Sequence, residues 1–256
     1  MSNLMFLGTG AHGKFENEFN NPNFRGTTSI MLDDKILIDF GRGGYWCAER
    51  LNKPSLFKNV DTVFYTHSHE DHFDADYLKK LCDESKNIVT IYADKVFELL
   101  LPKCDNLRFC PVSEFDLIKV HGYEVTPLKA NHATAYKQEN PLHYYFKGKK
   151  NIFFGFDGGW LIARTWEFLM NNPIDVYVID STCGEDYDYN LRNFSHNNSV
   201  MRDIIYNTCL AYNVMDKNSK MILTHIAPSL HDNENLTKNA IEKGYIAAYD
   251  GFLYNF

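Results

Sequence analysis

Residues 66–72 read Thr66-His67-Ser68-His69-Glu70-Asp71-His72 and place three imidazoles and two carboxylates within six residues. They follow an apolar run at 60–65, whose length and β-branched or aromatic content are typical of a buried strand. Side chains two apart on a strand-like exit point the same way. His67 and His69 are therefore predicted to hold one cation, while Asp71 and His72 reach a second. A polar turn rich in histidine is the alternative interpretation, but this spacing favours metal binding.

The size and composition of the chain predict one domain over residues 1–256. With 256 residues, 45% of them apolar, the chain can bury a substantial core. Its six cysteines form no CxxC pair, and the apolar run at 4–7 is too short for a secretory signal. These features predict free thiols in a reducing cytoplasm, and the sequence contains no candidate transmembrane span.

The net charge of −7 comes from 33 acidic against 26 basic residues, which makes long nucleic acid an unfavourable partner. It does not exclude a small phosphate substrate. Two bound divalent cations would dominate the charge that a small anion meets at the site. We therefore expect a small-molecule substrate and no membrane partner.

The order of predicted elements indicates an α+β fold. Strands at 5–7, 29–32 and 35–39 precede helices at 45–51 and 75–81, a strand at 88–92 and a helix at 95–101. Four strands follow at 116–120, 123–128, 142–146 and 152–154. Helices at 160–170, 199–212 and 235–243 then alternate with strands at 176–180, 221–224 and 246–249. Strand-rich segments followed by helices, twice over, predict two sheets with helices outside, an αββα four-layer sandwich.

Three further candidate ligands stand just past predicted strand ends: His132, Asp157 and His225. Each has a structural alternative when taken alone, as a structural or surface histidine or as a turn aspartate. Together with the residues at 67–72 they make seven ligands, enough for two divalent cations with one carboxylate bridging. Imidazole and carboxylate ligands suit zinc or manganese, and iron is compatible with the same set.

The segment His67-Ser68-His69-Glu70-Asp71-His72 matches the HxHxDH signature of the metallo-β-lactamase superfamily, and the chain resembles that family throughout. The resemblance implies a metallo-β-lactamase-like αββα sandwich with a binuclear metal centre. It assigns one metal to His67, His69 and His132, and the other to Asp71, His72 and His225. Asp157 would bridge the two metals, and Asp39 would hold the histidine loop from outside the ligand set.

Within the superfamily, the segments Leu7-Gly8-Thr9-Gly10 and Asn131-His132, and Asp180 with His196-Asn197, resemble the phosphonate-pathway cyclic phosphodiesterases and their ribonuclease Z relatives. This resemblance implies hydrolysis of a small or cyclic phosphodiester, and a homodimer is compatible with it. The chain departs from the phosphonate enzymes because it has no cysteine before Cys47 for their extra zinc. It also lacks the basic insertion with which ribonuclease Z holds transfer RNA.

The resemblance also implies a mechanism. A water activated by the two cations would attack phosphorus, Asp71 would orient that water, and His196 would protonate the leaving oxygen. His196 has a structural alternative as part of a helix cap. A thioester or lactone hydrolase with the same centre is the rival function. Two others, a di-iron flavoprotein and a non-catalytic scaffold, are disfavoured because His69 and all seven ligands are present.

Overall fold

The computed structural model describes residues 2–11, 24–184, 194–231 and 233–256. The chain divides into two compact units, which we describe separately. The first comprises Met1–Val112, Thr134–Asn140 and Tyr249–Phe256, and the second comprises Ser113–Ala133 and Pro141–Ala248. Each unit is built on a mixed seven-stranded sheet. The expectation of a single domain over the whole chain stays a prediction.

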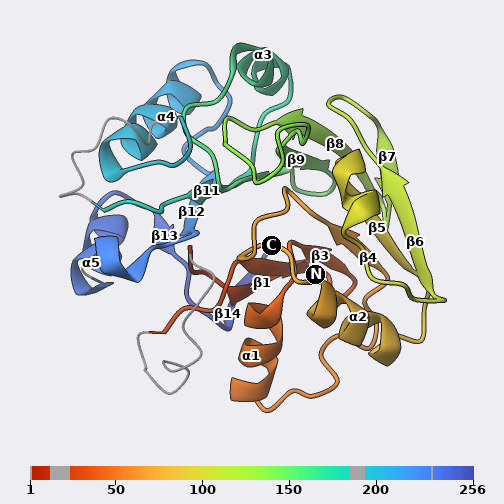
Figure 1. The fold of residues 1–256 in the computed structure, drawn as a ribbon. Helices are drawn as coiled ribbons and strands as arrows, with labels where there is room; N and C mark the ends of the chain where they lie inside the picture. Colours follow the sequence, from red (N-terminus) through yellow and green to blue (C-terminus); the bar gives the residue numbers. More distant parts are fainter. Residues whose placement is uncertain (1, 12–23, 185–193, 232) are drawn as a thin grey trace. The chain divides into compact units, whose positions relative to one another are not determined.

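The sheet of the first unit joins both ends of the chain, because its first and last strands pair with each other. Its strands run antiparallel on one side of β3 and parallel on the other. The helices α1 and α2 and the 3₁₀ helix η2 follow β3, β4 and β5 in the chain (Figure 1). The strands in sheet order are β14 (Phe252–Asn255), β1 (Asn3–Gly8), β2 (Ser29–Leu32), β3 (Ile36–Ile38), β4 (Thr62–Phe64), β5 (Val89–Ala93) and β6 (Leu107–Pro111), and the helices are α1 (Arg42–Arg50), α2 (Ala75–Glu84) and η2 (Lys95–Leu99).

The helices α1 and α2 close the hydrophobic core of the first unit. Alternate residues of the strands, such as Val63 of β4, point toward the helices, where they join Leu78 and Leu81 of α2 in one buried cluster. Asp74 fixes the start of α2, because its side chain accepts hydrogen bonds from two backbone N–H groups of the first turn. The helix that follows residues 66–72 is thus held by both a cap and a buried face.

In the sheet of the second unit, the antiparallel strands come first in the chain and the parallel strands last. Three helices and one short 3₁₀ helix connect the parallel strands. The strands in sheet order are β13 (Ile246–Ala247), β12 (Lys220–Thr224), β11 (Val176–Asp180), β10 (Ile152–Gly155), β9 (Leu142–Lys147), β8 (Tyr123–Lys129) and β7 (Ile118–Val120), and the helices are α3 (Ala163–Asn171), α4 (Ser199–Ala211), η4 (Pro228–Leu230) and α5 (Asn233–Glu242).

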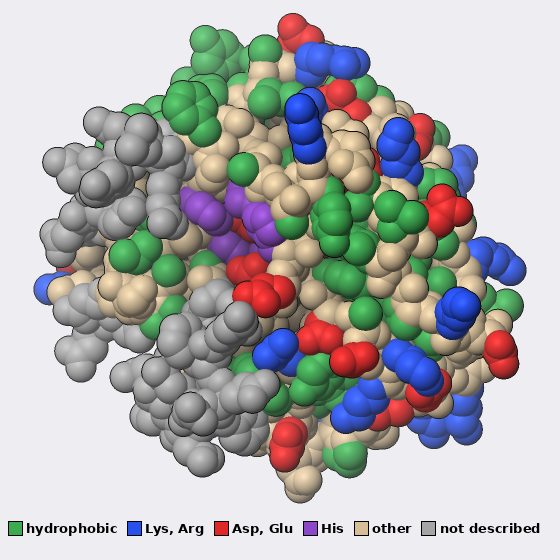
Figure 2. Space-filling view, viewed as in Figure 1, with side chains coloured by type: hydrophobic (Ala, Val, Ile, Leu, Met, Phe, Trp, Pro, Cys, Tyr) green, Lys and Arg blue, Asp and Glu red, His purple; other side chains and the backbone are tan. Residues whose placement is uncertain are grey.

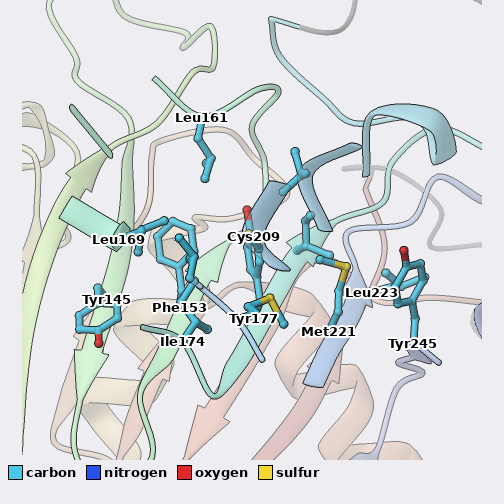
Figure 3. Close-up of a cluster of buried hydrophobic side chains, with 14 of the residues drawn as sticks. Tyr145, Phe153, Leu161, Leu169, Ile174, Tyr177, Cys209, Met221, Leu223 and Tyr245 are labelled. Carbon is cyan, nitrogen blue, oxygen red and sulfur yellow. The ribbon is translucent and has the colours of Figure 1, made fainter. Parts of the chain in front are cut away.

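A second hydrophobic core lies between this sheet and its helices. Phe153, Tyr177 and Leu223 come from three neighbouring strands and belong to one buried cluster with Leu169 of α3 and Cys209 of α4 (Figure 3). All five side chains are fully buried. This packing holds β10, β11 and β12 rigidly in register, and so fixes the positions at which these strands end.

Several predicted boundaries are corrected by the structure. The helix expected at 95–101 is the 3₁₀ helix η2, which ends at Leu99. Helix α1 begins at Arg42, earlier than expected, and α3 begins only at Ala163. The strands β6 and β14 were not predicted. Both are edge strands of the first sheet with half-exposed residues, so neither has the buried apolar pattern that marks a central strand.

The structure also tests two expectations from the sequence, the absence of a membrane-spanning helix and the presence of free thiols. Among the described residues, no helix is long and apolar enough to cross a membrane. All six cysteines are free thiols, and four of them are buried. The free thiols agree with the prediction from the sequence, while the cytoplasmic location stays a prediction.

Candidate metal centre

The candidate site residues follow the carboxyl ends of parallel strands in both units. In the first unit, Asp39 follows β3 and His67 follows β4, which pairs with it. In the second unit, Asp157, Asp180 and His225 stand at or just after the ends of β10, β11 and β12. Neighbouring parallel strands end at the same edge of a sheet, so each unit gathers its polar side chains at one edge.

Three of these residues have a left-handed backbone conformation that is uncommon outside glycine. The φ angles are 52° at Asp39, 56° at Asp157 and 53° at His225. Aspartate and histidine tolerate this region better than most residues, yet each instance costs about 1–3 kcal/mol and persists only where its surroundings enforce it. Strained residues of this kind cluster at functional sites. The conformation turns the chain sharply away from the strand while the side chain stays at its edge.

Two imidazoles of the first unit turn nitrogens toward one point. His67 Nε2 lies 2.9 Å from His69 Nδ1, which suits either one shared proton or one shared cation. The other nitrogen of His67, Nδ1, lies 3.0 Å from the hydroxyl of Thr66. The ring of His67 is thus oriented from outside, with Nε2 left for the shared point. This arrangement is the one that metal-ligating histidines adopt.

Asp39 orients the remaining histidine of the first unit. Its carboxylate is fully buried and accepts hydrogen bonds from the backbone N–H and the hydroxyl of Thr66, both at 2.7 Å. The same carboxylate lies 2.6 Å from Nδ1 of His72. Nε2 of His72 therefore faces the other way, where it lies 3.8 Å from a carboxylate oxygen of Asp71. These contacts are compatible with the outer role that the resemblance implies for Asp39, which stays a prediction.

Four side chains of the second unit form another cluster. Asp157, Asp180, His196 and His225 each offer one ligand atom, and these atoms all lie within 4.8 Å of one another. His196 Nδ1 lies 3.0 Å from Asp157 and 3.1 Å from Asp180. His225 Nε2 lies 3.6 Å from Asp157, while its Nδ1 is 3.3 Å from Asp180. His225 is therefore also fixed through one nitrogen, and the other faces the carboxylate of Asp157.

Asp180 and Thr182 are site residues that the sequence reasoning missed. Asp180 is fully buried and accepts hydrogen bonds from the backbone N–H groups of Thr182 and Asn197. The Thr182 hydroxyl lies 2.9 Å from Asp180 and 2.7 Å from Nδ1 of His225. The available signal was positional, because Asp180 ends a buried strand just as the predicted ligands do.

Charge holds this second cluster together. Burial disfavours the ionised form of Asp180, but hydrogen bonds and charge from His196 and His225 outweigh it, and the pKa of Asp180 is lowered. Burial likewise disfavours a charged His196. The carboxylates of Asp157 and Asp180 outweigh that penalty and raise the pKa of His196 to about 10. A divalent cation at Asp157 would compete with His196 for that carboxylate.

His132 also lies beside Asp157. Its Nδ1 is 2.9 Å from the backbone carbonyl oxygen of Ser195 and 3.4 Å from the Asp157 carboxylate. A hydrogen bond from Nδ1 to that carbonyl leaves Nε2 as the nitrogen able to bind a metal. His132, Asp157, His196 and His225 thus come together in the second unit, and His67, His69, Asp71, His72 and Asp39 in the first.

The donor sets suit divalent metals in both units. Imidazoles and carboxylates are ligands for zinc, manganese and iron, and the histidines are oriented by outer hydrogen bonds. Figure 2 shows histidine side chains reaching the surface on the face that it draws. On the same face, basic and acidic side chains are interspersed.

The chain belongs to the β-lactamase superfamily. The model of the β-lactamase superfamily domain matches residues 35–226, about three quarters of the chain. No curated protein is significantly similar in sequence.

Solved structures share the fold along the whole chain. The metallo-β-lactamase fold protein YhfI from Bacillus subtilis is 17% identical, with a TM-score of 0.76 and complete coverage of both chains. A diphosphatase from the PhnP family is 20% identical, with a TM-score of 0.71, and covers 100% of this chain and 97% of its own. The short form of human tRNase Z is 16% identical, with a TM-score of 0.67 and coverage of 99% and 98%.

The family and the fold confirm the predicted α+β, metallo-β-lactamase class. The clusters supply side chains that can bind metal ions. Together these findings define a metal-dependent hydrolase of the metallo-β-lactamase fold.

Proposed function

We propose that the protein is a phosphodiesterase that cleaves a small or cyclic phosphodiester with two divalent cations, zinc or manganese. Family membership supports the hydrolase class. The choice of a phosphodiester rests on one observation, the placement of His196 against two buried carboxylates. Interspersed surface charges and the net charge of −7 favour a small substrate over long nucleic acid.

The proposed ligand assignment uses seven residues. One cation would be held by His67, His69 and His132 and the other by Asp71, His72 and His225, with Asp157 as a ligand common to both. In support, the histidines described above are oriented through one ring nitrogen and leave the other for a metal. When bound, the cations acidify a water molecule and neutralise charge on the phosphate oxygens. Asp71 accepts a hydrogen bond from the attacking water and orients it.

His196 distinguishes phosphodiester from thioester chemistry. Its Nδ1 faces Asp157 and Asp180, so Nε2 is the nitrogen that can donate a proton outward. The bond from the water oxygen to phosphorus forms while the bond to the leaving oxygen breaks; the water releases one proton to solvent, the leaving oxygen takes the proton of Nε2, and solvent reprotonates His196. An alkoxide needs this proton because it is a poor leaving group. A thiolate leaves readily without one, so a thioesterase has less use for such a histidine.

The first experiment compares substrates under controlled metal content. The protein is stripped with a chelator, reloaded with zinc or manganese, and assayed with an aryl phosphodiester, the matching monoester and a thioester. We expect diester hydrolysis that depends on the metal and is lost in His69→Ala, because one of the converging nitrogens is removed.

Other outcomes would change the proposal. If the metal-loaded protein ignores the diester and cleaves the thioester or a lactone, the metal centre stands and the substrate class is a carboxylic ester or thioester. If the protein takes up no metal, the proposed centre fails.

A further inference from the structure

A buried carboxylate outside the predicted ligand set contacts the metal-binding stretch. Glu139 lies in the segment Thr134–Asn140 of the first unit and is 6% exposed. Its Oε2 accepts a hydrogen bond of 2.7 Å from the hydroxyl of Ser68. Ser68 is the single residue between His67 and His69.

The burial of Glu139 is compensated mainly by Ser68. Burial raises the pKa of the Glu139 carboxyl, and hydrogen bonds from the side chain and the backbone of Ser68 oppose this rise. The second oxygen, Oε1, is buried and has no hydrogen-bond partner among the described residues. A buried carboxylate is costly unless it is well paired. A carboxylate buried in this position needs an explanation, and its contact with Ser68 indicates a role there.

The segment that carries Glu139 is itself anchored to the first unit. Asn140 donates hydrogen bonds from its backbone and its side chain to one carboxylate oxygen of Asp94. Asp94 is buried, and it also caps the helix η2. The backbone N–H of Glu139 donates to the carbonyl of Tyr136. Glu139 is thus presented to Ser68 from a fixed backbone.

We propose that Glu139 is a positioning residue for metal binding. Through Ser68 it holds the backbone that joins His67 to His69, so that His67 Nε2 and His69 Nδ1 stay 2.9 Å apart and face one point. The inference rests on the proposed function, because it requires a metal at this histidine pair. Outer hydrogen bonds of this kind typically change metal affinity by about 10- to 100-fold.

The test measures zinc affinity by competition with a chromophoric chelator, so that its result does not depend on a substrate. Glu139→Ala and Ser68→Ala should each weaken zinc binding by about 10- to 100-fold. The double variant should bind zinc no more weakly than the weaker-binding single variant, because both single changes remove the same hydrogen bond. Glu139→Gln should retain most of the affinity, since its amide oxygen can still accept from Ser68.

Asp250→Ala is the matched control in the same unit. The side chain of Asp250 is 4% exposed and accepts hydrogen bonds from the hydroxyl and the backbone N–H of Thr9, away from residues 66–72 in sequence. The Asp250→Ala substitution should lower the free energy of unfolding and leave the zinc affinity unchanged. The proposal is overturned if folded Glu139→Ala binds zinc as the native protein does, or if Asp250→Ala weakens zinc binding equally.

Three further outcomes remain, and the last two separate this inference from the function on which it rests. If Glu139→Ala does not fold, Ser68→Ala removes the same hydrogen bond with a smaller change, and unaltered zinc affinity in that variant overturns the proposal. If the native protein binds no divalent metal, the proposed metal centre and this inference fall together. If the native protein binds metal and the variants match it, only the role of Glu139 is wrong.

Discussion

At the scale of single residues, His196 has the most specific environment in the second unit. Its Nδ1 lies 3.0 Å and 3.1 Å from two carboxylates. His196→Gln should lower kcat for an aryl phosphodiester by about 10²- to 10⁴-fold, the usual contribution of a general acid. KM and metal content should change little, because the variant removes a proton donor.

The check is steady-state kinetics together with metal analysis of the same sample. A diester with a more acidic leaving group should lose less activity in the variant, since it needs less protonation. Loss of metal from His196→Gln would instead make His196 a ligand and contradict its role as an acid.

Residue-level prediction is possible where the signal is local in sequence. His67, His69, Asp71 and His72 follow one strand within six residues, so their convergence can be inferred from spacing alone. Asp180 stands at the end of a buried strand, but its place in the cluster depends on contacts with Asn197 and His225, which are distant in sequence. Glu139 escaped notice for the same reason, because its partner Ser68 lies 71 residues away.

At the scale of elements, the parallel strands decide where chemistry is placed. Asp39, Asp157 and His225 follow the ends of such strands, and all three have a left-handed backbone conformation. The apolar pattern of buried strands was enough to predict β11 and β12 nearly to the residue. The left-handed turns that follow were not predictable, because aspartate and histidine have no strong preference for that conformation.

The start of α4 supports a prediction that separates capping from chemistry. The side chain of Asn198 accepts a hydrogen bond of 2.8 Å from the backbone N–H of Met201, so Asn198 is the N-cap residue of this helix. The capping alternative for His196 therefore belongs to Asn198. Asn198→Ala should lower the free energy of unfolding by about 1 kcal/mol. Urea titration measures this loss.

The control for Asn198→Ala is turnover at a temperature where the variant is folded, and it should stay close to that of the native protein. His196→Gln should instead lower turnover strongly at a temperature where it is folded, and it should also lose stability, because His196 pairs with the buried carboxylates of Asp157 and Asp180. If both variants lost turnover equally, the segment before α4 would affect activity through its structure as a whole. The argument for His196 as an acid would then fail.

At the scale of the whole molecule, two units each combine a hydrophobic core with a polar edge. The cores account for the fold class, because alternating apolar strands and amphipathic helices are visible in the sequence and define α+β layers. The polar edges work against stability in the absence of a cation. Buried carboxylates and imidazoles such as Asp157 and His67 lose hydration on folding, and protein hydrogen bonds restore it only in part.

Metal removal should therefore destabilise the whole protein. A ligand that binds only the folded state at 100 times its Kd adds about 2.7 kcal/mol to the free energy of unfolding. For a chain of this size we expect chelation to lower Tm by about 5–10 °C, and zinc or manganese to restore it. Calorimetry of native protein and His69→Ala, with and without chelator, measures the effect. The variant should melt at a temperature nearer that of stripped protein and respond less to chelator. An equal response in both would place the stabilising metal away from His69 and contradict the proposed ligand set.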